Sequence, residues 1–471
     1  MRPHARWAHG ALGSAVLLLL TGCTTLAPET RFGEVAALVR ERAGPVPQWH
    51  RQGGTSEAVR TRIAELLSEP LTADAAVEIA LLSSPALQAR FHDLGIAEAD
   101  LVQAGRLRNP TFSFGRLSGG GHVEIERAVV FNLLGVLTLP LSSEFAHQQF
   151  AQTQLEVAGD AVALAADARR AYFTAVTSAE LVRYFDQVRA SADAAAELAR
   201  RMAQAGNFSK LAHMREQAFY ADAAAQLARA QHQARADRER LGRMLGLTSS
   251  DDLRLPDRLP DLPAQPTEPV DAERLALERR FDVLAARQSA AAFARALNLS
   301  RATRFVNVLE VGYQNKSTTD EPRANGYELE LELPLFDFGS TRVARAEATY
   351  MRAVERTAEI ALNARSQVRE AYSAYRTTYD LAKHYRDEVV PLRKRISEES
   401  LLRYNGMLIG VFELLADSRE QVGSVTAAIE ALRDFWLADT DLQAAISGRG
   451  PGERAPVTRP SSAPPAAGAG H

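Results

Sequence analysis

The chain contains long segments whose apolar positions recur every three or four residues, which predicts helices. The clearest case is 340–404, where small and apolar residues follow alternating steps of three and four. They are Tyr350, Val354, Ala361, Ala364, Val368, Ala371, Tyr375, Ala382, Tyr385, Val389 and Leu392, with Thr357 and Thr378 filling the two gaps. This heptad stripe predicts a left-handed supercoiled helix, about 100 Å long, that packs laterally against other helices. Pro391 lies within the pattern and should kink the helix or locally loosen it.

Two short segments alternate with a period of two instead, which predicts β-strands. Tyr327–Leu333 places tyrosine and leucines on one face and carboxylates on the other, and His122–Glu126 repeats the pattern more weakly. The carboxylates are Glu124, Glu126, Glu328, Glu330 and Glu332. A soluble antiparallel sheet and a membrane barrel both show such alternation. Gly119–Gly121 and Lys316–Asn325 are expected to form the exposed loops at the hairpin tips.

The order of predicted elements occurs twice along the chain. Each half has a helical segment, a strand-like patch, a long helix, a short turn and a further helix. The helices span 71–107, 142–205 and 210–245 in the first half, and 272–301, 340–404 and 411–446 in the second. Leu137–Leu141 and Leu333–Leu335 are predicted to end the two strand patches in matching fashion. We interpret this as a duplicated unit, with repeat 1 at 71–247 and repeat 2 at 271–448.

Segments rich in proline or in small residues mark the boundaries. The linker 248–270 contains prolines at a spacing that neither a helix nor a central strand tolerates. The tail 449–471 is rich in glycine, proline, alanine and serine and is expected to be disordered. Thr24–Glu69 is expected to wrap the helical body, with Trp49 as an anchor.

Composition narrows the function and directs attention to one cysteine. A net charge of −3 provides no basic surface for a phosphate backbone, so no nucleic-acid partner is expected. Cys23 is the single cysteine, which excludes an intrachain disulfide and a metal site built from several cysteines. No histidine or methionine cluster suggests a copper or zinc site, so neither a bound metal nor a cofactor is expected.

Cys23 ends an N-terminal segment that fits a secretory signal peptide. Basic residues precede the apolar run Ala11–Leu20, which is too short to span a bilayer as a helix. The tetrapeptide Leu-Thr-Gly-Cys resembles a bacterial lipobox, which implies cleavage before Cys23 and its acylation, for example with palmitate. Thr24 in place of Asp favours sorting to the outer membrane, by analogy with bacterial lipoproteins; a buried thiol at the end of an uncleaved anchor is the alternative. We therefore predict a signal peptide at 1–22 and a lipidated segment at 23–70.

Beyond the lipobox, the sequence resembles the TolC-type outer-membrane efflux factors over about 71–448. The residues that carry the resemblance are Ala76–Leu87, Ala97–Pro110, Leu333–Gly339 and Arg403–Gln421. Asp93–Ala97 and Tyr404–Phe412 are closest to the heavy-metal, CzcC-like branch. The family implies a mostly α fold with a small β part. In it, duplicated units of long coiled-coil helices plus β-hairpins from three copies form a 12-strand β-barrel and a periplasmic α-helical tunnel.

The resemblance also implies a function. The protein would be a lipid-anchored homotrimer in the outer membrane of a Gram-negative bacterium, extending into the periplasm and serving as a passive duct. A periplasmic adaptor protein and an inner-membrane pump, expected to be of the RND type, would supply energy and substrate. Because two hairpins cannot close a barrel alone, several copies would share one, with leucines towards outer-membrane lipid and the five glutamates towards a wet lumen. Such a lumen suits cations, which favours heavy-metal export.

The family places a gate and docking loops near the helical tips. Phe412–Ala416 resembles the family's stretch with two acidic residues three apart. Glu413 matches the first acid, Ala416 departs from the second, and Asp417 follows one place along. Glu413 and Asp417 are the candidate pore gate, with an ordinary solvated charge as the alternative for Glu413. The candidate adaptor-docking residues at the two tips are Gly206, Asn207, Asn405, Gly406 and Gly410.

An enzyme is not expected. The chain has no Gly-x-Ser-x-Gly elbow, no phosphate-binding Gly-x-x-x-x-Gly-Lys loop and no His-Glu-x-x-His, and its ten histidines are scattered. Two other functions remain as alternatives. A structural coiled-coil lipoprotein explains the helices and the lipobox but not the alternating strands, and a type I secretion duct keeps the fold and changes the cargo.

Overall fold

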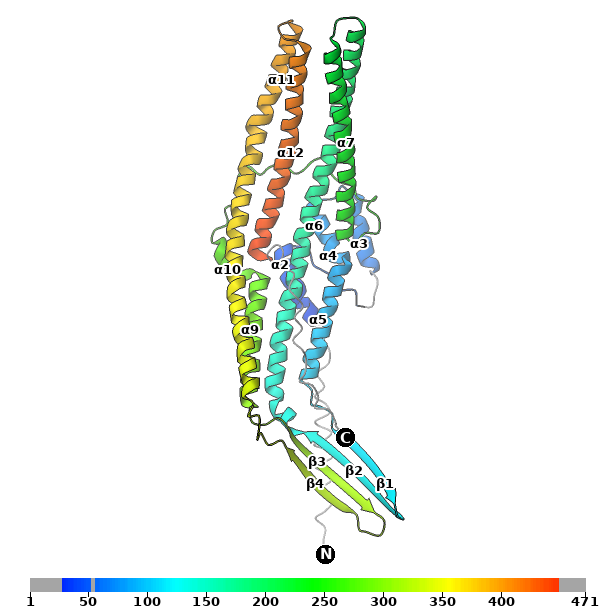
Figure 1. Cartoon of the computed structure of the whole chain (residues 1–471), viewed down its shortest axis with the longest axis vertical. Coiled ribbons are helices and arrows are strands. Elements are labelled where there is room, and N and C mark those ends of the chain that lie inside the picture. The colour runs from blue at the N-terminus through cyan, green and yellow to red at the C-terminus, as the bar shows by residue number, and fades with distance from the viewer. Residues whose placement is uncertain (1–27, 52–55, 449–471) are drawn as a thin grey trace. The chain divides into compact units, whose positions relative to one another are not determined.

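A computed structural model describes residues 28–51 and 56–448 (Figure 1). They form two compact units. Of the described residues, unit 1 comprises those up to 165 together with 242–254 and 283–362, and unit 2 comprises 166–241, 255–282 and those from 363 onwards. The predicted signal peptide, Cys23 and the predicted tail lie outside the described residues.

Unit 1 combines helices with the sheet. Its helices are α2 (Pro28–Ala43), α3 (Glu57–Ser68), α4 (Ala73–Ser83), α5 (Pro85–Ala104), most of α9 (Phe281–Ala302) and the first parts of α6 (Leu133–Gln204) and α10 (Ser340–His384). The prediction of one helical segment over 71–107 is wrong at Ser84, which is extended and ends α4. Pro85 then begins α5, because a proline disfavours a helical conformation at the residue before it.

The N-terminal segment is held on unit 1 by Trp49, as predicted. The Trp49 ring lies 5.7 Å from the rings of both Phe32 and His92. A Cβ atom on Gly95 would lie 3.3 Å from Trp49 Cη2, so the absence of a side chain there lets the indole approach α5 closely.

Unit 1 also contains one antiparallel sheet in the order β1 (Thr111–Gly119), β2 (His122–Asn132), β3 (Leu309–Thr318) and β4 (Ala324–Leu331). The predicted strand His122–Glu126 is confirmed within β2, and Tyr327–Leu333 is confirmed as far as Leu331, where β4 ends. Gly120 and Gly121 turn the first hairpin with positive φ angles of 61° and 85°. The second loop is shorter than the predicted Lys316–Asn325, because β3 continues to Thr318 and β4 begins at Ala324.

The strand ending predicted at Leu137–Leu141 is wrong, because α6 already begins at Leu133. The Oδ1 of Asn132 accepts a hydrogen bond from the Gly135 N–H and satisfies one free donor of the first turn. A Cβ atom at Gly135 would lie 2.8 Å from that oxygen, so this start of the helix depends on glycine. Pro140 is accommodated inside the helix.

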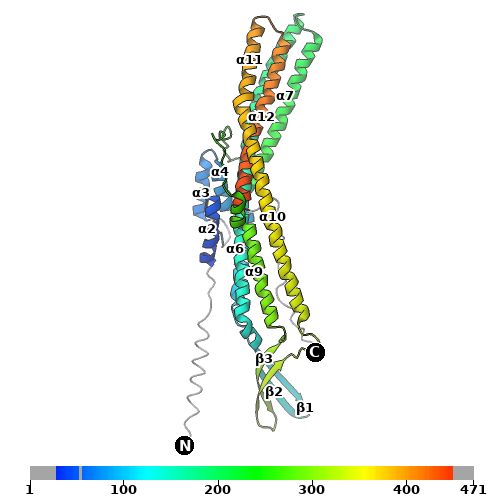
Figure 2. The same ribbon diagram turned by 90° about the vertical axis from the view of Figure 1, so that its left-hand side faces the viewer.

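Unit 2 contains two helical hairpins (Figures 1 and 2). One is formed by the end of α6 with α7 (Lys210–Met244), and the other by the end of α10, a π-helical turn (Tyr385–Val389), α11 (Val390–Asn405) and α12 (Val411–Ser447). The short helix α8 (Ala272–Arg279) completes the unit.

The single helix predicted over 272–301 is wrong at Arg280. This residue is extended, and its side chain is 1% exposed. The Arg280 guanidinium forms an ion pair with Asp282 at 2.5 Å and donates to the Ala445 carbonyl of α12 at 3.4 Å. The break between α8 and α9 therefore gives a buried arginine its partners.

The predicted stripe of α10 is confirmed in part. Ala364, Val368, Tyr375 and Ala382 are buried, whereas Leu392 in α11 is 51% exposed. The expected loosening near Pro391 is confirmed by the π-helical turn, in which the Val390 N–H bonds to the Tyr385 carbonyl.

The proline-rich segment has no helix or strand between α7 and α8, and unit 2 binds its second half through side chains. The Tyr375 hydroxyl accepts from the Thr267 N–H at 2.8 Å. The Tyr379 hydroxyl lies 3.1 Å from the Pro263 carbonyl, and the Trp436 indole donates to the Pro260 carbonyl at 3.1 Å. The segment forms no regular backbone hydrogen bonds of its own, so side chains of the helices that it crosses provide partners for its backbone polar groups.

Candidate functional site

The register of the sheet separates its side chains into two faces, since residues directly opposite each other in neighbouring strands share a face. The face that we call the acidic face carries Glu124, Glu126, Glu310, Gln314, Lys316, Glu328 and Glu330. The face that we call the apolar face carries Phe112, Phe114, Val129, Phe131, Leu309, Val311, Tyr313, Tyr327, Leu329 and Leu331. Four of the five predicted glutamates therefore lie together.

Hydrogen bonds and ion pairs order the acidic face. Lys316 forms an ion pair with Glu124 and a second, at 3.3 Å, with Glu126. Gln314 donates to Glu328. Lys316 is the only lysine or arginine that the strands place on this face, so the acids outnumber the bases.

The fifth predicted glutamate, Glu332, follows the end of β4. Its N–H donates to the Val308 carbonyl at 3.3 Å, and its Oε1 accepts from the Asn307 amide at 3.2 Å. Glu310 was missed by the sequence reasoning. It lies opposite Glu330 on the acidic face, and the alternating polar positions of β3 could have indicated it.

The apolar face is exposed in the single chain. Phe112, Tyr327 and Leu329 are 65%, 88% and 67% exposed, far more than apolar side chains in the core of a soluble protein. The outer strands β1 and β4 each pair with one neighbour only, so the described residues leave both sheet edges open. Long unpaired edges and a large exposed apolar face both call for a partner or a non-aqueous surrounding.

The two helical tips have the same backbone hydrogen bonds. At the first, the Gly206 N–H bonds to the Ala203 carbonyl, and at the second the Met407 N–H bonds to the Tyr404 carbonyl. Gly206 and Met407 both have left-handed backbones, with φ angles of 77° and 57°. The candidate docking residues Gly206, Asn207, Asn405, Gly406 and Gly410 are all exposed at these tips.

Gly406 is not the residue of the second tip that corresponds to Gly206. The matching hydrogen bonds align Gly406 with Ala205 instead, and the left-handed position belongs to Met407, which is 94% exposed. A methionine in this conformation is uncommon, because Cβ approaches the following carbonyl.

The two candidate gate carboxylates have different surroundings. Glu413 is exposed in the first turn of α12, which suits a carboxylate because the free N–H groups of that turn favour negative charge. Asp417 is half-buried and accepts a hydrogen bond from the Ser400 hydroxyl of α11. Asp417 thus ties α11 to α12, whereas Glu413 points to solvent.

An ion pair joins the two hairpins of unit 2, and no local sequence pattern indicated it. Glu216 of α7 is 2% exposed and accepts from Arg419 of α12 at 2.9 Å. The Arg419 guanidinium also lies 4.4 Å from the Phe219 ring centroid. Glu216 Oε2 and Arg419 Nε are buried without a hydrogen-bond partner in the described structure.

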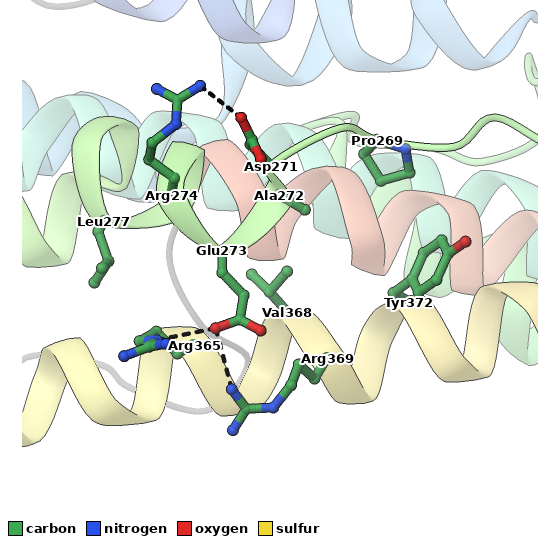
Figure 3. Close-up of a pocket in the computed structure, with 10 residues that line it drawn as sticks. All are labelled: Pro269, Asp271, Ala272, Glu273, Arg274, Leu277, Arg365, Val368, Arg369 and Tyr372. Atoms are coloured by element: carbon green, nitrogen blue, oxygen red, sulfur yellow. Dashed lines mark hydrogen bonds and ion pairs between the residues drawn. The ribbon is translucent and has the colours of Figure 1, made fainter.

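A surface hollow of about 600 Å³ lies between α8 and α10 (Figure 3). Glu273 projects between two arginines of α10 and forms ion pairs with Arg365 at 2.9 Å and Arg369 at 3.2 Å. Hydrogen bonds from Arg365 and then Arg369 lower the pKa of Glu273. Arg274 likewise forms ion pairs with Asp271 and Glu278. These charges satisfy one another, and none of the sequence-predicted site residues lies here.

The described residues contain no group of three or more histidine, cysteine, aspartate or glutamate side chains placed to hold a metal ion. None of their helices combines the length and the apolar character needed to cross a membrane.

The fold is that of outer-membrane channels. The structure of CmeC from Campylobacter jejuni, an outer membrane channel, aligns with a TM-score of 0.70 at 14% identity over 88% of this chain and 92% of that one. A structure of CusC, described in terms of transmembrane channel formation, aligns with a TM-score of 0.68 at 15% identity over 86% and 97%. The outer-membrane channel OprN aligns with a TM-score of 0.68 at 19% identity over 86% and 99%.

Sequence comparison points the same way. The model of the outer membrane efflux protein family matches residues 273–396, about a quarter of the chain. No curated protein sequence matches. The family match and the shared fold together support the outer membrane efflux protein family. Since these relatives are channels, they agree with the expectation that the chain is not an enzyme.

Proposed function

We propose that the chain is the outer-membrane channel component of a tripartite efflux system in a Gram-negative bacterium. The observation that carries the proposal is the sheet, which has an exposed apolar face, an acidic face and two open edges. The same chain carries long helical hairpins, and its fold is that of solved outer-membrane channels.

One four-stranded sheet cannot close on itself, but three copies paired edge to edge would supply twelve strands. The apolar face would contact lipid and the acidic face a water-filled lumen. The helices of the three copies would continue as a periplasmic tunnel. The repeated order of helix, hairpin and long helix in the chain fits a duplicated unit that contributes twice to each ring.

The proposed cargo is cationic, with heavy-metal ions as the substrate class. Five strand glutamates lie on the acidic face, and Lys316 is the one lysine of the strands that opposes their charge. Glu332 follows directly after β4. A lumen with this excess of negative charge would concentrate cations. Exposed Glu413 near the second tip would present a further ring of three carboxylates, and Asp417 would position α11 against α12.

The exposed tips are proposed to dock a periplasmic adaptor protein, with an inner-membrane pump of the RND type beyond it. The hydrogen-bonded turns at Gly206 and Met407 shape the loops that a partner would meet. Acylation of Cys23 would anchor each chain in the outer membrane, since several acyl chains bind stably where one is marginal. Cys23→Ser should abolish incorporation of labelled palmitate.

The decisive experiment is planar-bilayer conductance of the purified full chain, with the mass of the complex and the cation-to-anion selectivity measured on the same sample. A trimer with cation-selective currents supports the channel. Glu413→Ala should raise the current that leaks through the closed pore, whereas Glu413→Asp keeps the charge and should leave it unchanged. A monomer, or a silent bilayer, would favour a structural coiled-coil lipoprotein instead.

A further inference from the structure

Near the hairpin turns, the apolar face of the sheet is crossed by a row with arginine and asparagine side chains, which we call the basic row. Phe114, Arg127, Asn315 and Asn325 lie opposite one another across the four strands, and Arg116 follows two residues beyond Phe114 on the same face. Next to this row, on the side away from the hairpin turns, lie the aromatic residues Phe112, Tyr313 and Tyr327. In β1, β3 and β4 the face therefore changes from apolar to polar within one step of two residues, whereas β2 continues past Arg127 with Ile125 and Val123.

The two arginines of this row are close neighbours. Arg127 and Arg116 are diagonal partners across β1 and β2, a geometry that places such residues about 7–8 Å apart. Arg116 is exposed. Arg127 donates to Asn315 Oδ1 at 3.0 Å, which holds one edge of its guanidinium in place and leaves its other donors available.

No acid of the strands can neutralise them. All five strand glutamates lie on the acidic face, and the apolar face carries both strand arginines. A second copy of the sheet would present the same arrangement, so a neighbouring copy offers no strand carboxylate on this face either. Besides Asp320 and Glu321 in the loop between β3 and β4, an external anion is the partner that this charge separation leaves open.

We propose that Arg116 and Arg127 bind the phosphate groups of phosphorylated lipids in the membrane leaflet next to the hairpin turns. The inference rests on the proposed channel, since it requires the apolar face to contact lipid. In unit 1 the strands lead away from the helices and end in these turns (Figure 1), so the basic row lies at the far border of the apolar band. Arginine on a lipid-facing surface is tolerated best at such a border, where headgroups replace hydrocarbon.

The chemistry fits phosphate in particular. A guanidinium presents paired N–H donors that match phosphate oxygens, and two neighbouring arginines can bind two phosphate groups or clamp one. Their alkyl stems can lie along the adjoining aromatic residues while the charged heads reach the headgroup layer.

The test uses the full chain reconstituted in zwitterionic lipid nanodiscs and a fluorescent diphosphoryl lipid A as the probe. Arg116→Gln and Arg127→Gln should each weaken binding about tenfold, and the double variant should weaken it further. Lys316→Gln removes the same charge from the opposite face and should leave binding unchanged. Dephosphorylated lipid A should bind equally weakly to the unaltered protein and to every variant.

Conductance measured on the same samples distinguishes failure of the lipid site from failure of the proposed channel. If the unaltered protein conducts and the double variant still binds the probe as tightly, the lipid site is wrong while the channel stands. Equal loss of binding in Lys316→Gln would also overturn it, because the effect would then be one of net charge. If the unaltered protein forms no channel, the proposed function fails and this inference fails with it.

Discussion

Replacing Leu329 by arginine tests directly which face of the sheet meets lipid. Leu329 lies four residues from Asn325, where the apolar face gives way to the basic row. At about 3.3 Å per residue and a strand tilt of about 40°, this is about 10 Å below the border of an apolar band about 25 Å tall. Leu329 is thus near the middle of the band, where an arginine costs about 2–4 kcal/mol in each copy.

The matched control is Glu330→Arg, one residue along and on the opposite face. Glu330 lies opposite Glu310, so an arginine there replaces a like-charged pair by an attractive one and should not weaken the sheet. Per copy, Leu329→Arg should lower the ratio of folded to unfolded protein about 30- to 700-fold relative to this control.

The assay is folding into lipid vesicles over a urea series, with folded and unfolded chains separated by the mobility of unheated samples in detergent gels. Leu329→Arg should shift the urea midpoint strongly downwards, and Glu330→Arg should leave it near that of the unaltered protein. Equal shifts, or a larger shift for Glu330→Arg, would show that the assignment of the faces is wrong.

Three further predictions concern the helices. Met407→Gly should raise stability by about 1 kcal/mol in chemical unfolding, because glycine removes the strain of a left-handed residue, whereas Gly206→Ala should lower it; a loss in Met407→Gly would contradict the strain. Gly246→Ala should destabilise unit 1, because φ is +69° and its Cβ would lie 2.6 Å from the Ser83 carbonyl oxygen; unchanged thermal unfolding would refute this. Burial raises the pKa of Asp439, an effect that Arg169 partly opposes, so the ionised carboxylate costs stability at neutral pH and this cost disappears as pH falls towards 3.8. Asp439→Asn should therefore raise the melting temperature at pH 7 and lose that advantage at pH 3; a gain that is independent of pH would rule out the charge as its cause.

Local patterns were sufficient to predict most of the helices and strands. The stripe of α10 and the alternation in β4 are properties of consecutive residues, and each is confirmed where its side chains pack or pair. The position of the π-helical turn next to Pro391 follows from the missing proline N–H, which is also a local property.

The features that were missed depend on residues far apart in the chain. The break at Arg280 is supported by the Ala445 carbonyl, 165 residues away, and the Glu216–Arg419 pair spans 203 residues. The second tip shows a different limit. The left-handed residue there is Met407 and not the neighbouring Gly406, and only the hydrogen bonds of the helix end identify it.

The Glu216–Arg419 pair has a consequence for how the two hairpins of unit 2 can part. Each partner keeps one polar atom without a hydrogen bond in the described structure, so the closed contact leaves part of the hydrogen-bonding capacity of both groups unused. Arg419 is 36% exposed and already reaches solvent, so a small separation would mainly admit water to Glu216, satisfy its free oxygen and weaken the remaining attraction at the same time. The free-energy cost of separating the two hairpins is therefore concentrated at the beginning of the motion. The hairpins should separate abruptly, with few partly separated conformations populated.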